Sequence, residues 1–319
     1  MHSSSTPPNV VACDVAIIGC GPVGAIAANL LGLYGIQTIV LERELDVYHL
    51  PRAIHFDVDI MRIIQQLGLN EEMSAVVAPV SELQFLDRNR RLLFSASGTH
   101  SADEQDIDEH YVFYQPWMEE ILRESMKRFE CLQAYFGYAV RSITPASDGP
   151  LVTAYNSAKQ QPLNIQARYL LGCDGASSIT RKSLGIALQD FNFDKQWLVV
   201  DTFIKPSAVP QENTLSKSCQ LLCDERRPAV YVPSVGNHHR WEFMLAGHEL
   251  ASQFEQLEKV RELLSDWINP NYLDIHRITV YQFHSLIAQQ WRHGSIFLLG
   301  VAEFRYESEV SKALAPPRT

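Results

Sequence analysis

Short apolar runs that end at a glycine or an acidic residue are the strongest pattern in this chain. Such runs occupy residues 15–18, 38–41, 169–171 and 296–299, and each has the length of a buried strand. The spacing of apolar positions predicts helices at 51–69 (closed by Gly68), at 116–128 and near 251–267. Buried strands that alternate with amphipathic helices are typical of the α/β class.

Other segments alternate apolar and polar residues, as strands of antiparallel sheets do. Residues 81–98 have the pattern of a hairpin around a polar turn, and residues 132–171 alternate over most of their length. Residues 100–110 are polar and predict a surface loop, while residues 190–285 hold several short strand-like pieces. The middle of the chain is therefore rich in sheet.

The first apolar run leads directly into the sequence Gly19-Cys20-Gly21-Pro22-Val23-Gly24, and the second run ends at Glu42. This G-x-G-x-x-G order predicts a strand, a tight glycine turn, a helix and a second strand that ends in a carboxylate. Gly19 would allow the turn, Gly21 would admit a diphosphate, and Gly24 would let the helix pack against the strand. The helix N-terminus would attract the phosphates, and Glu42 would accept hydrogen bonds from the ribose. We predict a dinucleotide site here.

Two other interpretations of this region are open. A bare G-x-G-x-x-G occurs by chance, and the stretch from Val15 to Val40 carries no charged residue, as a membrane span of about 20 apolar residues would. The glycines, Pro22 and the polar Asn29 favour a buried βαβ unit instead. The fourth apolar run lies far along the chain, whereas a dehydrogenase domain would usually run its βαβ units consecutively. This order favours a flavoprotein.

Composition and charge limit the classes of partner. The 319 residues are 46% hydrophobic and 20% charged, and the formal net charge is −10. This charge argues against nucleic acid or an anionic membrane as the main partner. The six cysteines lack metal-ligand spacing, so we expect no metal site and free thiols in a reducing cytoplasm. Met1–Pro8 lacks the regions of a signal peptide, and we expect a frayed tail there.

A second glycine turn, in Leu171-Gly172-Cys173-Asp174-Gly175-Ala176, closely resembles the "DG" motif of single-component aromatic-ring flavin monooxygenases. The wider chain resembles the phenol hydroxylase and 3-(3-hydroxyphenyl)propionate hydroxylase branch of that family, from about residue 12 to 300. Further matching stretches are 51–53, 115–116, 226–228, 240–244 and 291–294. The resemblance implies a flavoprotein-hydroxylase α/β fold: a Rossmann-like parallel sheet with an antiparallel crossover, and a sheet-rich substrate domain. We expect the FAD-binding domain at 1–80, 108–189 and 283–319, and the substrate domain at 81–107 and 190–282.

The resemblance also implies roles for individual residues. The ADP half of FAD would be held by Gly19, Gly21, Gly24 and Glu42, and the flavin side by Arg52 and Gln115. Asp174 and Gly175 would lie near the diphosphate, and Arg181 would steady that turn. Asp57 falls where some relatives keep an acid near flavin and substrate, so we name it as a catalytic candidate. Each residue also has an ordinary structural explanation, since Arg52 and Arg181 suit surface ion pairs and Asp174-Gly175 suits a turn.

The activity that the resemblance implies is hydroxylation of a phenolic or other aromatic small molecule. NADPH or NADH would reduce FAD, O2 would form a flavin C4a-hydroperoxide, and its distal oxygen would pass to the ring. Two alternatives stay open: a shortened, non-catalytic flavoprotein-fold remnant, and an NAD-dependent dehydrogenase. The substrate and the oligomeric state, including a homodimer, stay open as well.

The sequence departs from the family after the strand at 296–299. The family has Gly-Asp-Ala-Ala-His there, whereas this chain has Gly300-Val301-Ala302-Glu303-Phe304. Val301 stands where a carboxylate would bind the ribityl chain, and Glu303 lies two residues too late to replace it. The 15 residues that follow hold no glycine. We therefore expect a C-terminally shortened member with an impaired flavin site.

Overall fold

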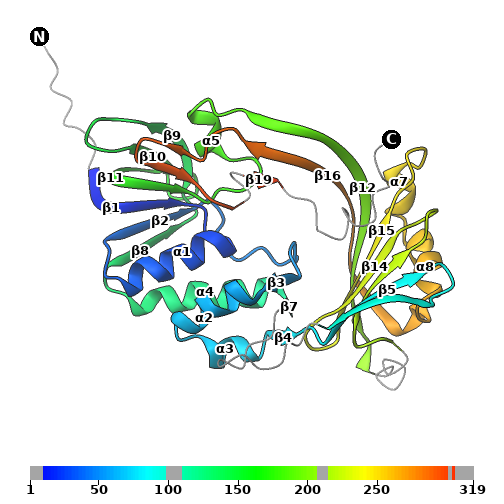
Figure 1. Cartoon of the computed structure of the whole chain (residues 1–319). Helices are drawn as coiled ribbons and strands as arrows, with labels where there is room; N and C mark the ends of the chain where they lie inside the picture. Colours follow the sequence, from blue (N-terminus) through cyan, green and yellow to red (C-terminus); the bar gives the residue numbers. More distant parts are fainter. Residues whose placement is uncertain (1–9, 98–109, 207–214, 301–303, 306–319) are drawn as a thin grey trace, which may run out of the picture. The chain divides into compact units, whose positions relative to one another are not determined.

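The computed structural model describes residues 10–97, 110–206, 215–300 and 304–305 (Figure 1). The predicted tail Met1–Pro8, most of the predicted loop 100–110, and Val301 and Glu303 lie outside the described residues. The described chain forms two compact units. The first draws on Met1–His49, Pro116–Phe191 and Leu286–Tyr306, and the second on Leu50–Gln115 and Asn192–Ser285.

The first unit is built on an eight-stranded sheet with the strand order β17-β18-β11-β1-β2-β8, extended from β11 by β10 and then β9. Its strands are β1 (Val10–Ile18), β2 (Thr38–Glu42), β8 (Leu132–Phe136), β9 (Ala139–Thr144), β10 (Leu151–Asn156), β11 (Gln161–Gly172), β17 (Arg292–His293) and β18 (Ile296–Leu298). Its helices are α1 (Pro22–Leu33), α4 (Gln115–Ser125), η1 (Met126–Arg128) and α5 (Ile179–Ser183).

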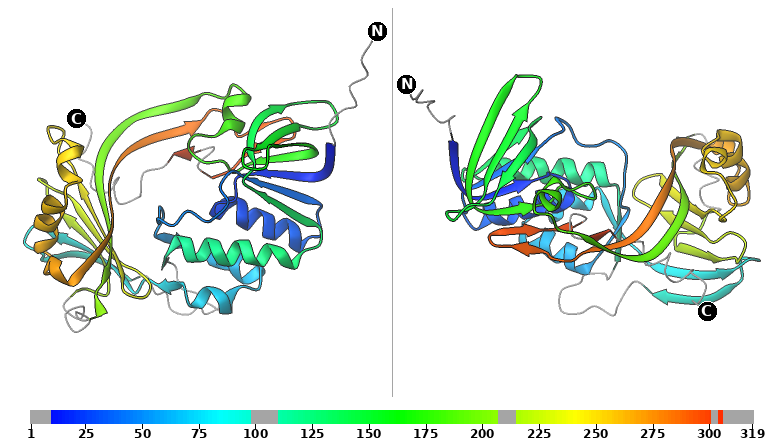
Figure 2. Two further views of the ribbon diagram at one scale, coloured as in Figure 1. Left: turned by 180° about the vertical axis from the view of Figure 1, so that it is seen from behind. Right: turned by 90° about the horizontal axis from the view of Figure 1, so that it is seen from above.

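The centre of this sheet is parallel. β1 pairs in parallel with both β2 and β11, so that Ala16 lies opposite Ile39 and Leu170, all of them buried. α1 and α4 lie on one side of these strands, as Figure 1 and the rear view in Figure 2 show. Residues 15–40 thus form strand, helix and strand, and no helix in the described part of the chain is long and apolar enough to cross a membrane.

Antiparallel strands extend the same sheet, as the alternation in 132–171 predicts. β9, β10 and β11 pair in antiparallel order, and their apolar residues join the core around Ile39 and Leu41. The prediction is wrong for residues 132–136, because β8 pairs in parallel with β2. The helix α4 precedes β8 and acts as a crossover connection, which leads to a parallel strand.

The second unit holds an eight-stranded and a three-stranded sheet, ordered β19-β16-β12-β15-β14-β13-β5-β6 and β3-β7-β4. The larger sheet contains β5 (Glu82–Asp87), β6 (Leu92–Ser97), β12 (Leu188–Ile204), β13 (Cys219–Cys223), β14 (Ala229–Pro233), β15 (His238–Met244), β16 (Leu273–Ala288) and β19 (Phe304–Arg305). The ends of β12 and β16, and β19, belong to the first unit. The other elements are β3 (His55–Asp57), β4 (Val77–Pro79), β7 (His110–Phe113), α2 (Val58–Gln66), α3 (Asn70–Ser74), α7 (Ala251–Phe254), α8 (Leu257–Ser265) and η3 (Pro270–Tyr272).

The larger sheet buries side chains on both faces around β12, which follows from the alternation of side chains along a strand. On β12, Leu198 packs in a cluster with Phe254 and Leu264 of α7 and α8. Its neighbour Trp197 points to the other face and packs in a cluster with Val112 of the small sheet. The strand-like pieces predicted in 190–285 therefore form a two-sided core.

The helix predicted at 51–69 is shorter than expected. It begins at Val58, and residues 55–57 form the strand β3 against β7. Asp57 accepts hydrogen bonds from the N–H groups of Asp59 and Ile60 and so caps the helix. The apolar spacing of Ile54 and Val58 fits a helix, but pairing with β7 holds the first part extended.

The two compact units differ from the predicted domain division at residues 50–80 and 110–115, which belong to the second unit. The reason is packing, since Ile54, Val80 and Val112 share a buried cluster with Trp197 and Val230. The functional division into FAD-binding and substrate domains stays a prediction.

Candidate functional site

The first glycine turn lies in the first unit, at the carboxyl end of β1. Gly19 has a φ of +95°, and a Cβ there would lie 2.4 Å from the Cys173 carbonyl oxygen. A Cβ on Gly24 would lie 1.9 Å from the carbonyl oxygen of Gly19. A Cβ on Gly21, in contrast, would meet no described atom within 4 Å. Two of the three predicted glycines are thus needed for packing, and the third faces open space.

The second glycine turn packs directly against the first. The Cys173 N–H donates to the Ile18 carbonyl at 2.8 Å, so the carboxyl ends of β1 and β11 meet at these turns. Ligands of open α/β sheets bind at the carboxyl ends of the strands, which is where these predicted residues gather.

Asp174 faces the start of α5. Its carboxylate accepts hydrogen bonds from the Ser178 hydroxyl at 2.6 Å and from the N–H and hydroxyl of Thr180 at 2.9 and 3.0 Å. Gly175 has a φ of +72°, as the turn requires. Arg181 donates its N–H to Ser178 and its guanidinium to the Ile186 carbonyl. Asp174 therefore fixes this turn by capping the start of α5, and Arg181 binds the backbone that follows the end of α5.

Glu42 reaches back to the first turn from the end of β2. One carboxylate oxygen accepts the Cys20 N–H at 2.7 Å, and the other accepts the Glu44 N–H at 2.9 Å. The structure thus brings together the predicted Gly19, Gly21, Gly24, Glu42 and Asp174 regions within one unit.

Arg52, Gln115 and Asp57 belong to the second unit. The buried Gln115 side-chain oxygen accepts the N–H groups of Arg52 and Ala53 at 2.8 and 2.7 Å. The Arg52 side chain is exposed. Gln115 thus fixes the backbone from which Arg52 projects. Asp57 is exposed and caps α2.

The carbonyls of the same segment are held by buried arginines. Arg240 donates to the Arg52 carbonyl at 2.9 Å and to the Pro51 carbonyl at 3.1 Å, and Arg277 also donates to Pro51. Arg240 forms a bidentate salt bridge with Asp201, with nitrogen–oxygen distances of 2.7 and 3.1 Å. The segment 51–53 is therefore held through its backbone N–H groups, by Gln115, and through its backbone carbonyls, by the two arginines.

Asp201 is ionised and fully buried in this network. Burial by itself raises its pKa, but the hydrogen bond from His238 and the charge of Arg240 outweigh burial and hold the pKa below its usual value. Burial lowers the pKa of His238, whose neutral ring donates to Asp201 at 3.1 Å. Burial raises the pKa of Glu242, which lies 3.8 Å from Arg240. The network thus pairs one carboxylate with guanidinium groups and a neutral ring.

Several residues of these sites were not predicted from the sequence. Asp201 is an acid within an otherwise apolar strand run, which is a signal for a buried pair. Arg240 lies in a stretch that resembles the hydroxylase family, and the resemblance implies no role for it. Arg123 donates two hydrogen bonds to the Cys20 carbonyl, and its place on a predicted helix gave no sign of that contact.

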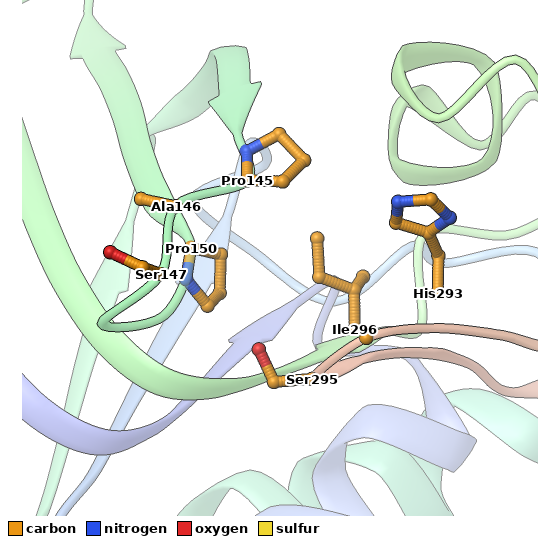
Figure 3. Close-up of a pocket in the computed structure, with 8 residues that line it drawn as sticks. Pro145, Ala146, Ser147, Pro150, His293, Ser295 and Ile296 are labelled. Atoms are coloured by element: carbon orange, nitrogen blue, oxygen red, sulfur yellow. The ribbon is translucent and has the colours of Figure 1, made fainter.

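Other features of the described residues lie apart from these sites. A hollow of about 350 Å³ lies between the β9–β10 loop and the β17–β18 turn and is lined by Pro145, Ser147, His293 and Ile296, among others (Figure 3). It is at the amino end of β18, opposite the glycine turns. No group of three or more His, Cys, Asp or Glu that could hold a metal occurs among the residues that the structure describes.

Comparison with known proteins gives a family for most of the chain. A family model described as "FAD binding domain" matches residues 12–303. The chain is 31% identical over 292 residues to the 3-(3-hydroxy-phenyl)propionate/3-hydroxycinnamic acid hydroxylase of Mycolicibacterium smegmatis, which covers 91% of this chain and 50% of that protein. It is 30% identical over 308 residues to a probable NADH-specific resorcinol 4-hydroxylase of Rhodococcus jostii, which covers 95% and 56%. The chain spans about half the length of the curated relatives it matches.

Solved structures share the fold. The p-nitrophenol 4-monooxygenase PnpA of Pseudomonas putida DLL-E4 superimposes with a TM-score of 0.82 at 18% identity, over 93% of this chain and 75% of that one. Aklavinone-11 hydroxylase, solved with FAD and aklavinone, gives a TM-score of 0.77 at 20% identity, over 93% and 58%. The expected α/β flavoprotein-hydroxylase fold is confirmed.

Proposed function

Because the chain belongs to the FAD binding domain family, we propose that it binds FAD and serves in the NADPH- or NADH-dependent hydroxylation of an aromatic small molecule. A phenolic substrate and O2 are the proposed co-reactants, in keeping with the names of the relatives in Mycolicibacterium and Rhodococcus. A cytoplasmic location is part of the same proposal.

The contact between the two glycine turns supports this proposal most directly. Gly19 packs against Cys173, so the nucleotide fingerprint and the Asp174-Gly175 motif form one edge of one sheet. A plain dehydrogenase domain has no role for the second motif. The contact between the two motifs therefore favours a flavoprotein over an NAD-dependent dehydrogenase.

The residues at this edge fit the ADP part of FAD. Gly21 precedes the first helical turn of α1, no described side chain caps that helix, and a Cβ on Gly21 would meet open space. A diphosphate can therefore approach the backbone N–H groups there. In this proposal Gly19, Gly21, Gly24 and Glu42 hold the ADP half, while Asp174, Gly175 and Arg181 shape the turn beside the diphosphate.

The segment 51–53 is proposed to serve the flavin end. Its backbone is fixed by Gln115, Arg240 and Arg277, so the exposed Arg52 side chain starts from a rigid base. A rigid base lowers the entropy cost of holding a bound group. Asp57 is proposed as the acid near the substrate, in addition to its role as a helix cap. The chemistry that FAD supplies when bound is electron transfer from a reduced nicotinamide and activation of O2.

Flavin binding is the first test. The purified 319-residue chain is mixed with FAD, passed through gel filtration and scanned between 300 and 550 nm. Flavin absorbance that co-elutes with the protein supports the proposal, and an eluate without flavin overturns it. NADH and NADPH oxidation is then followed with and without phenols.

The second step separates the alternatives. Oxidation that phenols stimulate, with hydroxylated product, supports the hydroxylase. FAD binding without product supports a flavin-binding protein that does not hydroxylate. Binding of NAD without FAD would support the dehydrogenase.

A further inference from the structure

The peptide unit that follows Cys20 is held by a side chain from a distant helix. Arg123 of α4 donates from Nε and Nη2 to the Cys20 carbonyl oxygen, at 3.3 and 3.2 Å. The Cys20 N–H is held separately, by Glu42 at 2.7 Å. Cys20 is thus fixed at both its backbone groups, although its neighbours Gly19 and Gly21 leave the chain free to rotate.

Arg123 is itself well placed for this contact. Its guanidinium lies 5.0 Å from the centre of the Phe136 ring, and Phe136 on β8 pairs with Glu42 on β2. Arg123 is half-buried, so its contacts are partly shielded from water. The helix α4, which carries Arg123, and the strand β8, which carries Phe136, therefore set the position of this guanidinium at the carboxyl edge of the sheet.

The charge of Arg123 is not cancelled by the thiol beside it. Burial raises the pKa of Cys20 to about 12, so the thiol stays neutral near pH 7. The guanidinium therefore adds a positive charge next to the glycine turn. The carboxylates of Glu42 and Glu119 act on the same thiol, so the guanidinium offsets negative charge that would otherwise repel an anionic diphosphate.

Peptide geometry links the Arg123 contact to the open side of the turn. The Cys20 carbonyl and the Gly21 N–H belong to one planar trans peptide, in which they point in opposite directions. A guanidinium that holds the carbonyl thus directs the Gly21 N–H away from Arg123. Within the described chain, no hydrogen bond from the Gly21 N–H is found.

We propose that Arg123 is a positioning residue for the dinucleotide: it orients the Cys20–Gly21 peptide and thereby sets the affinity of the glycine turn for the ADP moiety. This inference rests on the proposed FAD-binding function. The proposed role lies at the ADP end of the site and not at the flavin end. Loss of Arg123 should therefore weaken the binding of ADP and of FAD to the same extent.

The test compares Arg123→Gln, Arg123→Lys and Arg128→Gln with the unchanged chain, by calorimetric titration with ADP and with FAD. Arg128 is the matched control, because it also donates to a backbone carbonyl, that of Ser125, and lies 5.1 Å from the Phe129 ring centre. We expect Arg123→Gln to weaken ADP and FAD by the same factor, about tenfold, as for the loss of a charged hydrogen bond. Arg123→Lys restores part of the affinity, and Arg128→Gln leaves it unchanged.

Thermal unfolding of the ligand-free variants separates this role from a structural one. Arg123→Gln and Arg128→Gln are expected to lower the melting temperature by similar amounts, since both lose hydrogen bonding to a backbone carbonyl and a contact with a phenylalanine ring. Unchanged ADP affinity in Arg123→Gln overturns the inference, as does a loss equal to that of Arg128→Gln. If Arg123→Gln does not fold, Arg123→Lys decides: full affinity for ADP overturns the inference, and reduced affinity supports it. If the unchanged chain binds neither ADP nor FAD, the proposed function fails and this inference fails with it.

Discussion

Gly24 faces the carbonyl oxygen of Gly19 so closely that a Cβ on Gly24 would lie 1.9 Å from that oxygen. The backbone fixes the position of a Cβ, and the oxygen belongs to the backbone, so no side-chain rotation can relieve the overlap. The approach joins the first turn of α1 to the end of β1, and it makes the third glycine of the fingerprint a packing residue.

Gly24→Ala is therefore expected to destabilise the first unit, by about 1–3 kcal/mol or more, as overpacking does. Urea unfolding followed by circular dichroism measures the loss. A variant as stable as the unchanged chain would contradict the close approach. FAD binding falls together with stability in this variant.

Gly21→Ala is expected to behave in the opposite way. Gly21 has a φ of −75°, and a Cβ there meets no described atom within 4 Å, so the ligand-free protein keeps its stability. The methyl group occupies the space proposed for the diphosphate, and FAD affinity falls by about tenfold or more. Fluorescence titration with FAD measures the affinity, and Gly24→Ala serves as the contrast. Unchanged affinity would place the diphosphate elsewhere.

Arg240→Ala is expected to cost about 3–5 kcal/mol of stability, because it leaves the buried Asp201 carboxylate without its main partner. It also removes the Arg240 hydrogen bonds to the Pro51 and Arg52 carbonyls, of which Pro51 keeps the bond from Arg277. Denaturant titration measures the change. The exposed pair of Arg62 with Asp59 is the control, and Arg62→Ala should change stability by less than about 1 kcal/mol.

A double variant tests whether the cost arises from the unpaired charge. Asp201→Leu combined with Arg240→Met replaces the pair by apolar groups and is expected to lose less stability than Arg240→Ala alone. Both variants lose the Arg240 hydrogen bonds to segment 51–53, so a double variant that is less stable than Arg240→Ala would show that the unpaired carboxylate is not the main cost.

Stability is expected to fall as the pH drops from about 6.5 to 4, because of His239. Burial, with a smaller contribution from the neighbouring His238, lowers the pKa of His239 from 6.5 to about 4. The unfolded chain takes up the proton first, so it is favoured as the pH falls through this window, by about 3 kcal/mol in total. Denaturant titrations at several pH values measure the slope.

His239→Gln should flatten that slope, since the titrating group is removed. The exposed His248 provides the control, and His248→Gln should leave the slope as it is. An unchanged slope in His239→Gln would assign the pH dependence to other groups.

Local pattern predicted the elements whose neighbours along the chain determine them. The apolar runs that end at Gly19, Glu42 and Gly172 became β1, β2 and β11, because a buried parallel strand needs an apolar run and a tight exit. The start of the helix at 51–69 could not be predicted in this way. The backbone of residues 52 and 53 is held by Gln115, more than 60 positions away, and the spacing of apolar residues along the chain cannot predict that contact.

The site shows the same division. The glycines and Glu42 could be predicted from their spacing, because each acts on the backbone beside it. Arg123 could not, since it reaches Cys20 across 103 positions of sequence. Asp201 was visible as an acid in an apolar strand, but its partners Arg240 and Arg277 lie on other strands of the sheet.

The pairing of β1 with β11 has a consequence for synthesis of the chain on the ribosome. Ile18 pairs with Gly172, so one edge of the apolar strand β1 waits for a partner made about 150 residues later. At about 5–20 residues per second, this wait lasts roughly 10–30 s. An open apolar strand edge is a site for wrong pairing during that time. Chaperone dependence and yield should therefore respond to translation speed between β2 and β11, because the nucleotide edge closes only when the second glycine turn has emerged.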